Sequence, residues 1–383
     1  MYRLTDLREI LRYVPQFRDR VFVIAMDGAV VDDENFVNLM LDIALLRSLR
    51  IAVVLIHGAS LQIQRLAELT GATPSNIDGT GITDQATLQL ALTAANRVTH
   101  EILEGLSNND LRGAHGNTLV AHPAGILHGV DYQYTGRVER VDTLFLHNLL
   151  DHDIIPVIPP LGSDGEGNTY RLNSDAVAVE VARALRAVKL IYLTGDEGVR
   201  QGGTLLRHLS VEEAEAIVKK HRGEIAPSSF SKLENAIRAA QSGVPRIHII
   251  NGRLEEGLLA EVFSNEGIGT LVYANEYQAI RRAQNKRDAR AIYRLIQTSM
   301  ENDEILRRTQ LDIERHVGEF FMFEVDRNPV GCMALHYYPD ERQAELACVC
   351  VDPKHENQGI GVKLMQYAEA QARAQGVREL FCL

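Results

Sequence analysis

Residues 345–361 read Glu345-Leu-Ala-Cys-Val-Cys-Val-Asp-Pro-Lys-His-Glu-Asn-Gln-Gly-Ile-Gly361, and an amphipathic run over residues 362–375 follows. This pattern predicts an apolar strand, a glycine-containing turn and a helix. Backbone N–H groups at such a helix start bind anions, because the first turn lacks internal acceptors and carries the positive dipole end. Gly359 and Gly361 have no Cβ atoms, so a phosphate can approach closely. A bare Gly-x-Gly is also typical of an ordinary tight turn, but the flanking strand and helix favour the phosphate site.

This strand, turn and helix resemble the acetyl-CoA pyrophosphate loop of the GNAT family of N-acetyltransferases, whose pattern is Gln/Arg-x-x-Gly-x-Gly/Ala. The first of the six matching positions is Glu356, which departs from the pattern and places a negative charge near a diphosphate. The resemblance implies acetyl-CoA as co-substrate, with the strand backbone pairing with the pantetheine arm and polarising the acetyl carbonyl. The implied acetyl-CoA contacts are Cys348, Val349, Cys350, Val351, Gln358, Gly359, Ile360, Gly361 and Lys363, the last of which could offset Glu356.

The composition excludes several classes of partner and site. The formal net charge is −11, so a nucleic-acid partner is not expected. No run of about 18 apolar residues predicts a membrane span, and charges interrupt the N-terminus where a signal peptide needs an apolar core. The four cysteines form no Cys-x-x-Cys pair, which indicates reduced thiols in a cytoplasmic protein and no metal site.

The first part of the chain alternates short apolar strands with helices. Strands are expected at residues 21–25, 51–57, 154–158, 189–194 and 246–250, with helices between them at 34–48, 61–70, 84–105, 141–151, 174–187, 211–220 and 230–242. This order predicts a mostly parallel sheet covered by helices on both faces. Ligands bind at the carboxyl ends of such strands. The sequence therefore places a cleft at residues 27–28, 58–60 and 195–198.

The remainder has α+β order, and we expect two domains, residues 1–278 and 279–383. Helices are predicted at residues 288–300 and 304–317, a hairpin at 320–325 and 329–337, and further strands at 343–351 and 377–383. Members of the GNAT family continue beyond a fifth strand of this kind. We therefore expect the GNAT domain to be truncated at its C-terminus, which puts the activity of the chain in doubt.

The first part resembles the amino-acid kinase family, an α/β sandwich around a parallel sheet. The opening strand of that family ends Lys-x-Gly-Gly, whereas the matching residues here are Ala25, Met26, Asp27 and Gly28. The lysine that holds the transferred phosphoryl group is absent, and an acid replaces one glycine. Phosphoryl transfer depends on positioning and charge neutralisation. We therefore expect the fold to be kept and kinase activity to be lost.

A kinase-like domain without its lysine, followed by a GNAT domain, resembles the bacterial N-acetylglutamate synthase family over essentially the whole chain. The resemblance implies transfer of acetyl from acetyl-CoA to the amino group of L-glutamate, the first step of arginine biosynthesis, with L-arginine as allosteric effector. Two alternatives stay open. One is an acetylglutamate kinase-like enzyme with an appended domain, and the other is a non-catalytic arginine-binding regulatory protein.

An arginine site is implied by the family pattern Lys…His-x-x-(Asp/Asn)-Gly…Glu-x-Phe…Gly-x-Gly-Thr. A carboxylate suits the arginine guanidinium because the two form bidentate hydrogen bonds. The resemblance also implies an N-terminal helix that closes this pocket and links subunits into a homo-oligomer, a hexamer. The matching residues are Tyr13, Lys232, His248, Glu261 and Gly267.

Acetyl transfer to an amine needs a base, because an ammonium at neutral pH is not a nucleophile. Glu345 is the candidate, since it interrupts an apolar strand, and a carboxylate buried there is costly unless used or paired. A strand-end glutamate that reaches solvent or pairs with Arg342 is the other interpretation. The two carboxylates of glutamate need cations, and Arg307 and Arg308 match the family's Arg-Arg element, although they also fit a solvated pair. His336 and Tyr337 could line the same cleft.

Overall fold

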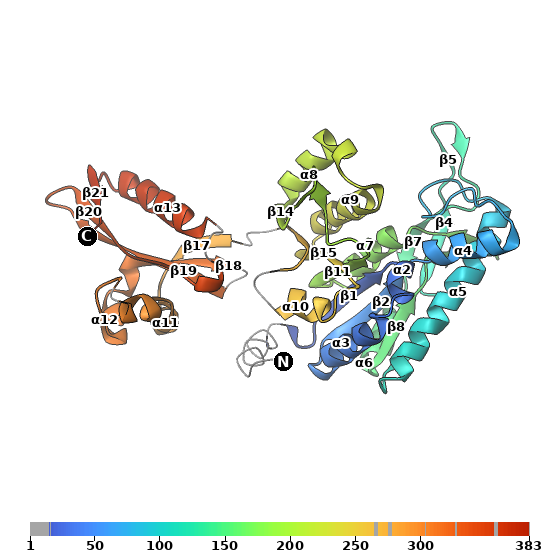
Figure 1. Cartoon of the computed structure of the whole chain (residues 1–383), viewed down its shortest axis with the longest axis horizontal. Helices are drawn as coiled ribbons and strands as arrows, with labels where there is room; N and C mark the ends of the chain where they lie inside the picture. The colour runs from blue at the N-terminus through green and yellow to red at the C-terminus, as the bar shows by residue number, and fades with distance from the viewer. Residues whose placement is uncertain are drawn as a thin grey trace. The chain divides into compact units, whose positions relative to one another are not determined.

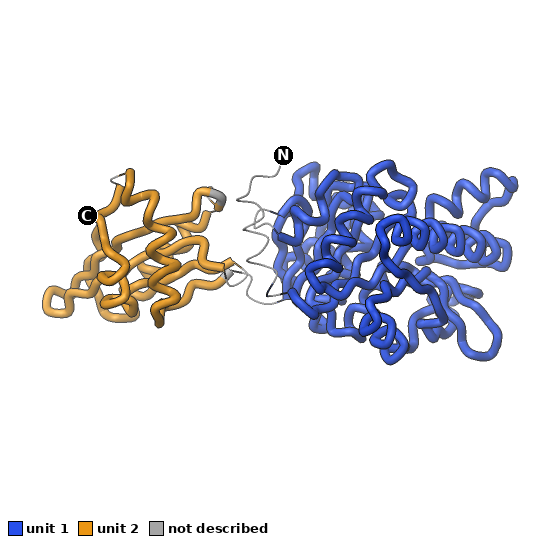
Figure 2. The backbone as a smooth tube through the Cα atoms, turned by 90° about the horizontal axis from the view of Figure 1, so that it is seen from below, with its two compact units in different colours: residues 1–275 blue, residues 276–383 orange. Residues whose placement is uncertain are grey.

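The computed structural model describes residues 15, 17–263, 267–274, 278–302, 304–325, 328–355 and 359–382. The chain divides into two compact units, residues 1–275 and 276–383 (Figure 2). The second unit begins with strand β17 (Gln278–Arg282).

Unit 1 is built on an eight-stranded sheet of order β14-β16-β15-β11-β1-β2-β8-β3 (Figure 1). The pairs from β15 to β3 are parallel, whereas β16 runs antiparallel to β15. The mostly parallel sheet predicted from the alternating pattern is therefore confirmed. The strands are β1 (Val21–Met26), β2 (Ala52–His57), β3 (Arg112–Ala114), β8 (Ile154–Ile158), β11 (Lys189–Thr194), β14 (His208–Ser210), β15 (Arg246–Asn251) and β16 (Thr270–Tyr273).

Helices cover both faces of this sheet, so alternate strand residues enter two different cores. Along β1, Val23 and Ala25 pack on one side, whereas Phe22, Ile24 and Met26 pack on the other. The first core is closed by α6 (Thr143–Asp151), α7 (Ser174–Ala184), α8 (Val211–Lys220) and α9 (Pro227–Gln241), and the second by α3 (Phe36–Ser48), α4 (Ser60–Thr70), α5 (Gln85–Ser107) and α10 (Gly257–Phe263).

Smaller elements complete unit 1. The short helix α2 (Gly28–Val31) follows β1 directly, and η1 (Arg222–Glu224) lies between α8 and α9. A four-stranded sheet has the order β10-β9-β4-β7, and two two-stranded ribbons pair β5 with β6 and β12 with β13. The bounds are β4 (Leu119–Pro123), β5 (Ile126–Leu127), β6 (Val130–Asp131), β7 (Gly136–Val141), β9 (Leu161–Ser163), β10 (Thr169–Arg171), β12 (Arg200–Gln201) and β13 (Thr204–Leu205).

Unit 2 is a five-stranded sheet of order β17-β18-β19-β20-β21, with α11 and α12 on one face and α13 on the other (Figure 1). The pairs from β17 to β20 are antiparallel, and β20 pairs with β21 in parallel. The elements are α11 (Lys286–Glu301), α12 (Gln310–Arg315), η2 (Val317–Glu319), β18 (Phe320–Val325), β19 (Asn328–Tyr338), β20 (Gln343–Val351), η3 (Pro353–His355), α13 (Ile360–Ala374) and β21 (Glu379–Phe381).

One predicted helix of unit 2 is too long. The expectation of a helix over residues 304–317 is wrong, because α12 covers only Gln310–Arg315. Thr309 sets its start through a capping box, in which the Thr309 Oγ1 accepts from the Asp312 N–H at 3.2 Å and the Asp312 carboxylate accepts from the Thr309 N–H at 2.9 Å. Residues 304–308 therefore remain outside the helix and place the two arginines before its first turn.

Candidate functional site

A bulge in β20 lies at the centre of unit 2. Cys332 pairs with Cys350 and Ala334 with Ala347, so two residues of β20 face the single residue Met333. Cys348 takes up the extra residue in the left-handed region, with φ of 52°. A bulge of this kind leaves backbone groups out of the ladder and turns them aside. This is the place where the sequence predicted polarisation of an acetyl carbonyl.

The β20 edge beyond the bulge is open on the β21 side. The pairing with β21 covers only Gln343, Ala344 and Glu345, and residues 346–351 have no partner strand on that side within the described part of the chain. An extended ligand can therefore add to this edge as a strand would. The predicted contacts Cys348, Val349, Cys350 and Val351 all lie on it, which fits a pantetheine arm with its two amides.

The predicted phosphate turn leads into α13, which begins at Ile360. Gly359 has φ of 74°, so its conformation favours glycine, and an added Cβ atom at Gly359 or Gly361 would meet nothing within 4 Å. The backbone is thus open to an approaching anion. Lys363 is exposed in the first turn, with Nζ 6.0 Å from the centre of the Phe323 ring. Gln358 and Glu356 lie outside the described residues.

Glu345 is half-buried, so its carboxylate is not enclosed in the apolar core of the strand. The apolar core on its face of the sheet includes Ala334 and Cys348 but ends before it. Instead, the Tyr338 hydroxyl donates to Glu345 Oε2 at 3.1 Å, and His336 stands directly opposite in the ladder. Glu345 therefore keeps access to solvent and to a substrate amine.

The two arginines predicted to bind the substrate differ in burial. Arg307 is exposed, whereas Arg308 is half-buried, and its Nη2 donates to His336 Nε2 at 3.4 Å. Burial is the main influence raising the pKa of the nearby Cys348 thiol, and Arg308 opposes it. Arg308 thus lies beside the β20 bulge.

His336 is held from its other side by Glu319, whose carboxylate accepts a hydrogen bond from His336 Nδ1. Burial acts to raise the pKa of Glu319, but hydrogen bonds from His336 and His316 lower it overall. Glu319 was missed by the sequence analysis, because a glutamate in a short turn before a strand has no distinctive pattern.

Chemically, one face of unit 2 combines a solvent-accessible carboxylate at Glu345, a guanidinium at Arg308 and an open strand edge at a bulge. A carboxylate can take a proton from an ammonium, a guanidinium can hold a carboxylate, and backbone N–H groups can stabilise an oxyanion. These are the requirements of acyl transfer to an amino acid. Within the ranges that the structure describes, no three His, Cys, Asp or Glu side chains lie together as a metal site requires.

In unit 1, three of the residues predicted for arginine come together. His248 Nδ1 and Glu261 Oε1 are 2.6 Å apart, and Glu261 Oε2 accepts from the backbone N–H of Ile268 at 2.6 Å and of Gly269 at 3.3 Å. Burial pushes the pKa of Glu261 upward, but the hydrogen bonds prevail and bring it to about 2. Gly267 lies against the same carboxylate, since a Cβ atom added there would be 3.6 Å from Glu261 Oε2.

The cation of this cluster is Lys189 and not the predicted Lys232. Lys189 Nζ lies 3.1 Å from His248 Nε2 and 5.1 Å from the centre of the Phe17 ring. Burial, followed by the charge of Lys189, lowers the pKa of His248 to about 4, so the imidazole is neutral at pH 7. A charged residue at the start of an otherwise apolar strand was the available signal for Lys189. Tyr13 lies outside the described residues.

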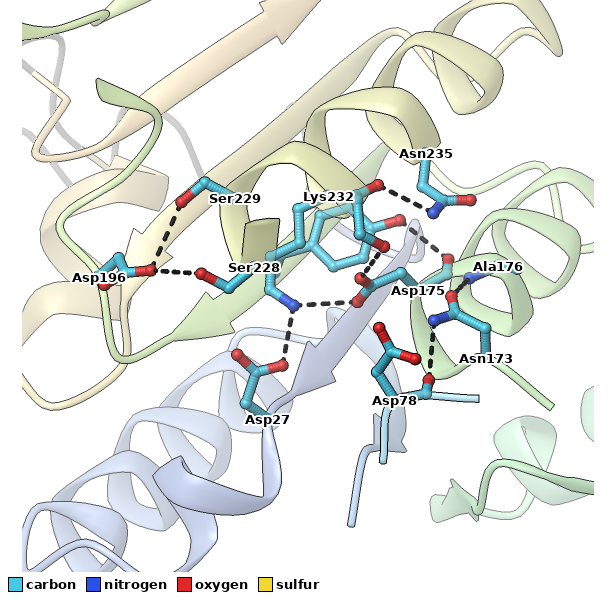
Figure 3. A network of polar contacts seen from close by, with 12 residues as sticks. Asp27, Asp78, Asn173, Asp175, Ala176, Asp196, Ser228, Ser229, Lys232 and Asn235 are labelled. Atoms are coloured by element: carbon cyan, nitrogen blue, oxygen red, sulfur yellow. Dashed lines mark hydrogen bonds and ion pairs between the residues drawn. The ribbon is translucent and has the colours of Figure 1, made fainter. Parts of the chain in front are cut away.

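Lys232 lies instead in a buried network at the carboxyl end of β1 (Figure 3). Its Nζ donates to Asp27 Oδ1 at 2.8 Å and to Asp175 Oδ1 at 3.1 Å. Burial raises the pKa of Asp175, while the two carboxylates more than offset burial and raise that of Lys232. The predicted assignment of Lys232 to the arginine cluster is therefore wrong, because two acids hold its ammonium elsewhere.

The stability of unit 1 is expected to depend on pH through Asp42, which lies on α3. Asp42 is 8% exposed, and burial, followed by the charge of Glu256, raises its pKa from 3.8 to about 7. The folded protein therefore binds the carboxyl proton of Asp42 more tightly than the unfolded chain does. The stabilisation that comes from this protonation is complete below pH 3.8 and is lost as the pH rises through 7. Asp42→Asn should add about 1–3 kcal/mol to the free energy of unfolding at pH 8 and little at pH 4.

Urea unfolding at the two pH values measures this difference. Asp151→Asn changes an exposed aspartate and serves as the matched control, with no expected effect at either pH. An Asp42→Asn effect of equal size at pH 4 and pH 8 would contradict the interpretation.

No helix in the described part of the chain has the length and apolar character of a membrane span. Residues 20–251 match the model of the amino acid kinase family, and residues 286–383 match the acetyltransferase (GNAT) family. The amino-acid acetyltransferase of Vibrio cholerae is 34% identical over 392 aligned positions, covering 98% of this chain and 88% of that protein.

Two solved structures of N-acetylglutamate synthase from Neisseria gonorrhoeae match all of this chain. The complex with coenzyme A and L-arginine has a TM-score of 0.88 at 32% identity and is covered to 90%. The complex with coenzyme A and N-acetyl-glutamate has a TM-score of 0.70 at 33% identity and is covered to 89%. By this similarity over both units, the chain belongs to the amino-acid acetyltransferase family, the N-acetylglutamate synthases, and is an N-acetyltransferase that uses acetyl-CoA.

Proposed function

We propose that this protein transfers acetyl from acetyl-CoA to the α-amino group of L-glutamate, the first step of arginine biosynthesis. The observation that carries the proposal is the placement of Glu345 and Arg308 around His336, beside the β20 bulge. Solved relatives complexed with coenzyme A and with N-acetyl-glutamate support the choice of substrate.

In this proposal Glu345 takes a proton from the substrate ammonium, directly or through a water, so that the neutral amine can attack the thioester carbon. Backbone N–H groups freed by the bulge at Cys348 stabilise the resulting oxyanion. Arg308 holds a substrate carboxylate. The attack forms the amide C–N bond, and collapse of the intermediate breaks the C–S bond and releases coenzyme A as thiolate, which takes up the proton that the attacking nitrogen loses.

A panel of acceptors tests the substrate assignment. Thiol release from acetyl-CoA is measured with L-glutamate, L-glutamine, L-aspartate and L-lysine at equal concentration. We expect kcat/KM for L-glutamate to exceed that for L-glutamine by more than tenfold, because the amide lacks the charge that pairs with an arginine. Equal rates with glutamine or lysine would contradict glutamate as the acceptor.

We further propose that L-arginine binds at the cluster of His248, Glu261 and Lys189 and modulates this activity. The carboxylate of Glu261 is buried and charged, which suits a guanidinium, and a solved relative is complexed with L-arginine. Glu261→Gln is expected to weaken arginine binding at least tenfold, measured by calorimetric titration. Glu255→Gln, an exposed glutamate just before α10, should bind arginine normally.

An unchanged arginine affinity in Glu261→Gln, with basal acetyl transfer retained, would contradict this location for the effector. The predicted homo-oligomer, a hexamer, rests on the N-terminal helix around Tyr13 and stays a prediction.

Kinase activity is not favoured. Ala25 stands where the kinases of this fold carry lysine, and Asp27 engages the neighbouring cation Lys232. The ammonium of Lys232 at the end of β1 is thus already paired with two carboxylates, which disfavours its use in stabilising a transferring phosphoryl group.

A further inference from the structure

Three side chains from separate segments of unit 2 form a chain of polar contacts. Glu319 belongs to η2, His336 to β19, and Arg308 to the segment before α12. The Glu319 carboxylate accepts from His336 Nδ1, and His336 Nε2 faces Arg308 Nη2 at 3.4 Å. His336 thus connects an acid to a guanidinium.

The order of these contacts fixes the imidazole tautomer. Because Glu319 accepts a hydrogen bond at Nδ1, the proton of neutral His336 lies there, and Nε2 carries a lone pair. A guanidinium can only donate, so Arg308 Nη2–H donates to that lone pair.

Placing a histidine between the two charges has a specific consequence for Arg308. If Glu319 contacted the guanidinium directly, the two would form an ion pair, and the charge of Arg308 would no longer be available to a second carboxylate. His336 orients the guanidinium instead through the ring nitrogen Nε2 and stands between it and the carboxylate of Glu319. Arg308 is therefore ordered while its charge remains available to another carboxylate.

The chain of contacts from Glu319 through His336 to Arg308, called the relay below, lies next to the proposed acetyl-transfer site. His336 is the direct cross-strand neighbour of Glu345, so the two side chains share one face of the sheet. Arg308 Nε is buried without a hydrogen-bond partner in the described part of the chain. An unpaired buried N–H is unfavourable for folding, which indicates that the geometry of Arg308 serves something other than stability.

We propose that His336, oriented by Glu319, is a positioning residue that presents Arg308 to a carboxylate of the acceptor amino acid. This inference rests on the proposed function. It assigns to His336 and Glu319 no role in proton transfer to or from the reacting amine, which remains with Glu345. Loss of the relay should therefore weaken binding of the acidic acceptor while leaving use of acetyl-CoA intact.

Steady-state kinetics with both substrates test the relay. His336→Ala is expected to raise KM for L-glutamate at least tenfold, with kcat changed less than threefold and KM for acetyl-CoA unchanged. His336→Gln should recover most of the affinity, because its amide oxygen can accept from Arg308 near the place of Nε2. His316→Ala removes the other, exposed histidine that contacts Glu319 and should behave as the unmodified protein.

A double-mutant cycle separates positioning from a structural role. In the Arg308→Ala background, His336→Ala should raise KM for L-glutamate no further, because the group it positions is gone. A fall in kcat at unchanged KM, full additivity with Arg308→Ala, or no recovery in His336→Gln would each overturn the inference. Absence of glutamate-dependent activity in the unmodified protein would instead refute the proposed function and the relay with it, so the two failures are distinguishable.

Discussion

Replacing Glu345 with glutamine is expected to lower kcat for acetyl transfer to L-glutamate about 10²–10⁴-fold, the range typical of a lost general base. Glutamine keeps the shape of the side chain and can still accept from the Tyr338 hydroxyl, so the strand should remain intact. The amide cannot take a proton from the substrate ammonium. KM for acetyl-CoA should stay within about threefold, since the acetyl-CoA edge of β20 is untouched.

The control for this variant is Glu341→Gln, an exposed glutamate in the turn before β20. It should retain full activity. If Glu345→Gln lost less than fivefold in kcat while remaining folded, Glu345 would not be the base, and the interpretation as a strand-end carboxylate would stand.

The second large effect is on stability. Lys232→Met should lower the free energy of unfolding of unit 1 by about 3–5 kcal/mol, because it leaves the buried carboxylate of Asp175 and the half-buried one of Asp27 without their cation. Asp175 is 6% exposed and cannot recover its charge interaction from solvent, and Asp27 loses the same partner (Figure 3). Methionine fills much of the lysine volume, so the effect reports charge more than packing.

Urea unfolding measured for unit 1 tests this, since the two units need not unfold in one transition. Lys219→Met removes an exposed lysine that pairs with Glu215 along α8 and should cost less than about 1 kcal/mol. Adding Asp27→Asn and Asp175→Asn to Lys232→Met should restore part of the loss. A Lys232→Met variant as stable as the Lys219→Met control would contradict the ion-pair account.

Strong local patterns were sufficient to predict most of the fold. The apolar runs at β1 and β2 and the helix over residues 211–220 appear where the sequence placed them. The error at residues 304–317 arose because helical periodicity alone does not show where a helix begins. The capping box of Thr309 decides that start.

At the candidate sites, too, some residues could be predicted from the sequence and others could not. Motifs with a fixed spacing predicted Glu345, Arg308, His248 and Glu261; the structure joins His248 to Glu261 and places Arg308 and Glu345 next to His336. Lys189 was missed because its neighbour His248 is 59 residues away along the chain, and only strand pairing joins them. The sequence left the burial of Glu345 open between two interpretations, because burial depends on where the core ends in three dimensions.

The most direct test of the central claim is product stoichiometry with the unmodified protein. Acetyl-CoA and L-glutamate are incubated with the protein, and free coenzyme A and N-acetyl-glutamate are both quantified. The account predicts that the two products form in a ratio of one to one, and that coenzyme A release falls to the background rate without L-glutamate. Coenzyme A release that is independent of L-glutamate, or no acetylated product from folded protein, would contradict it.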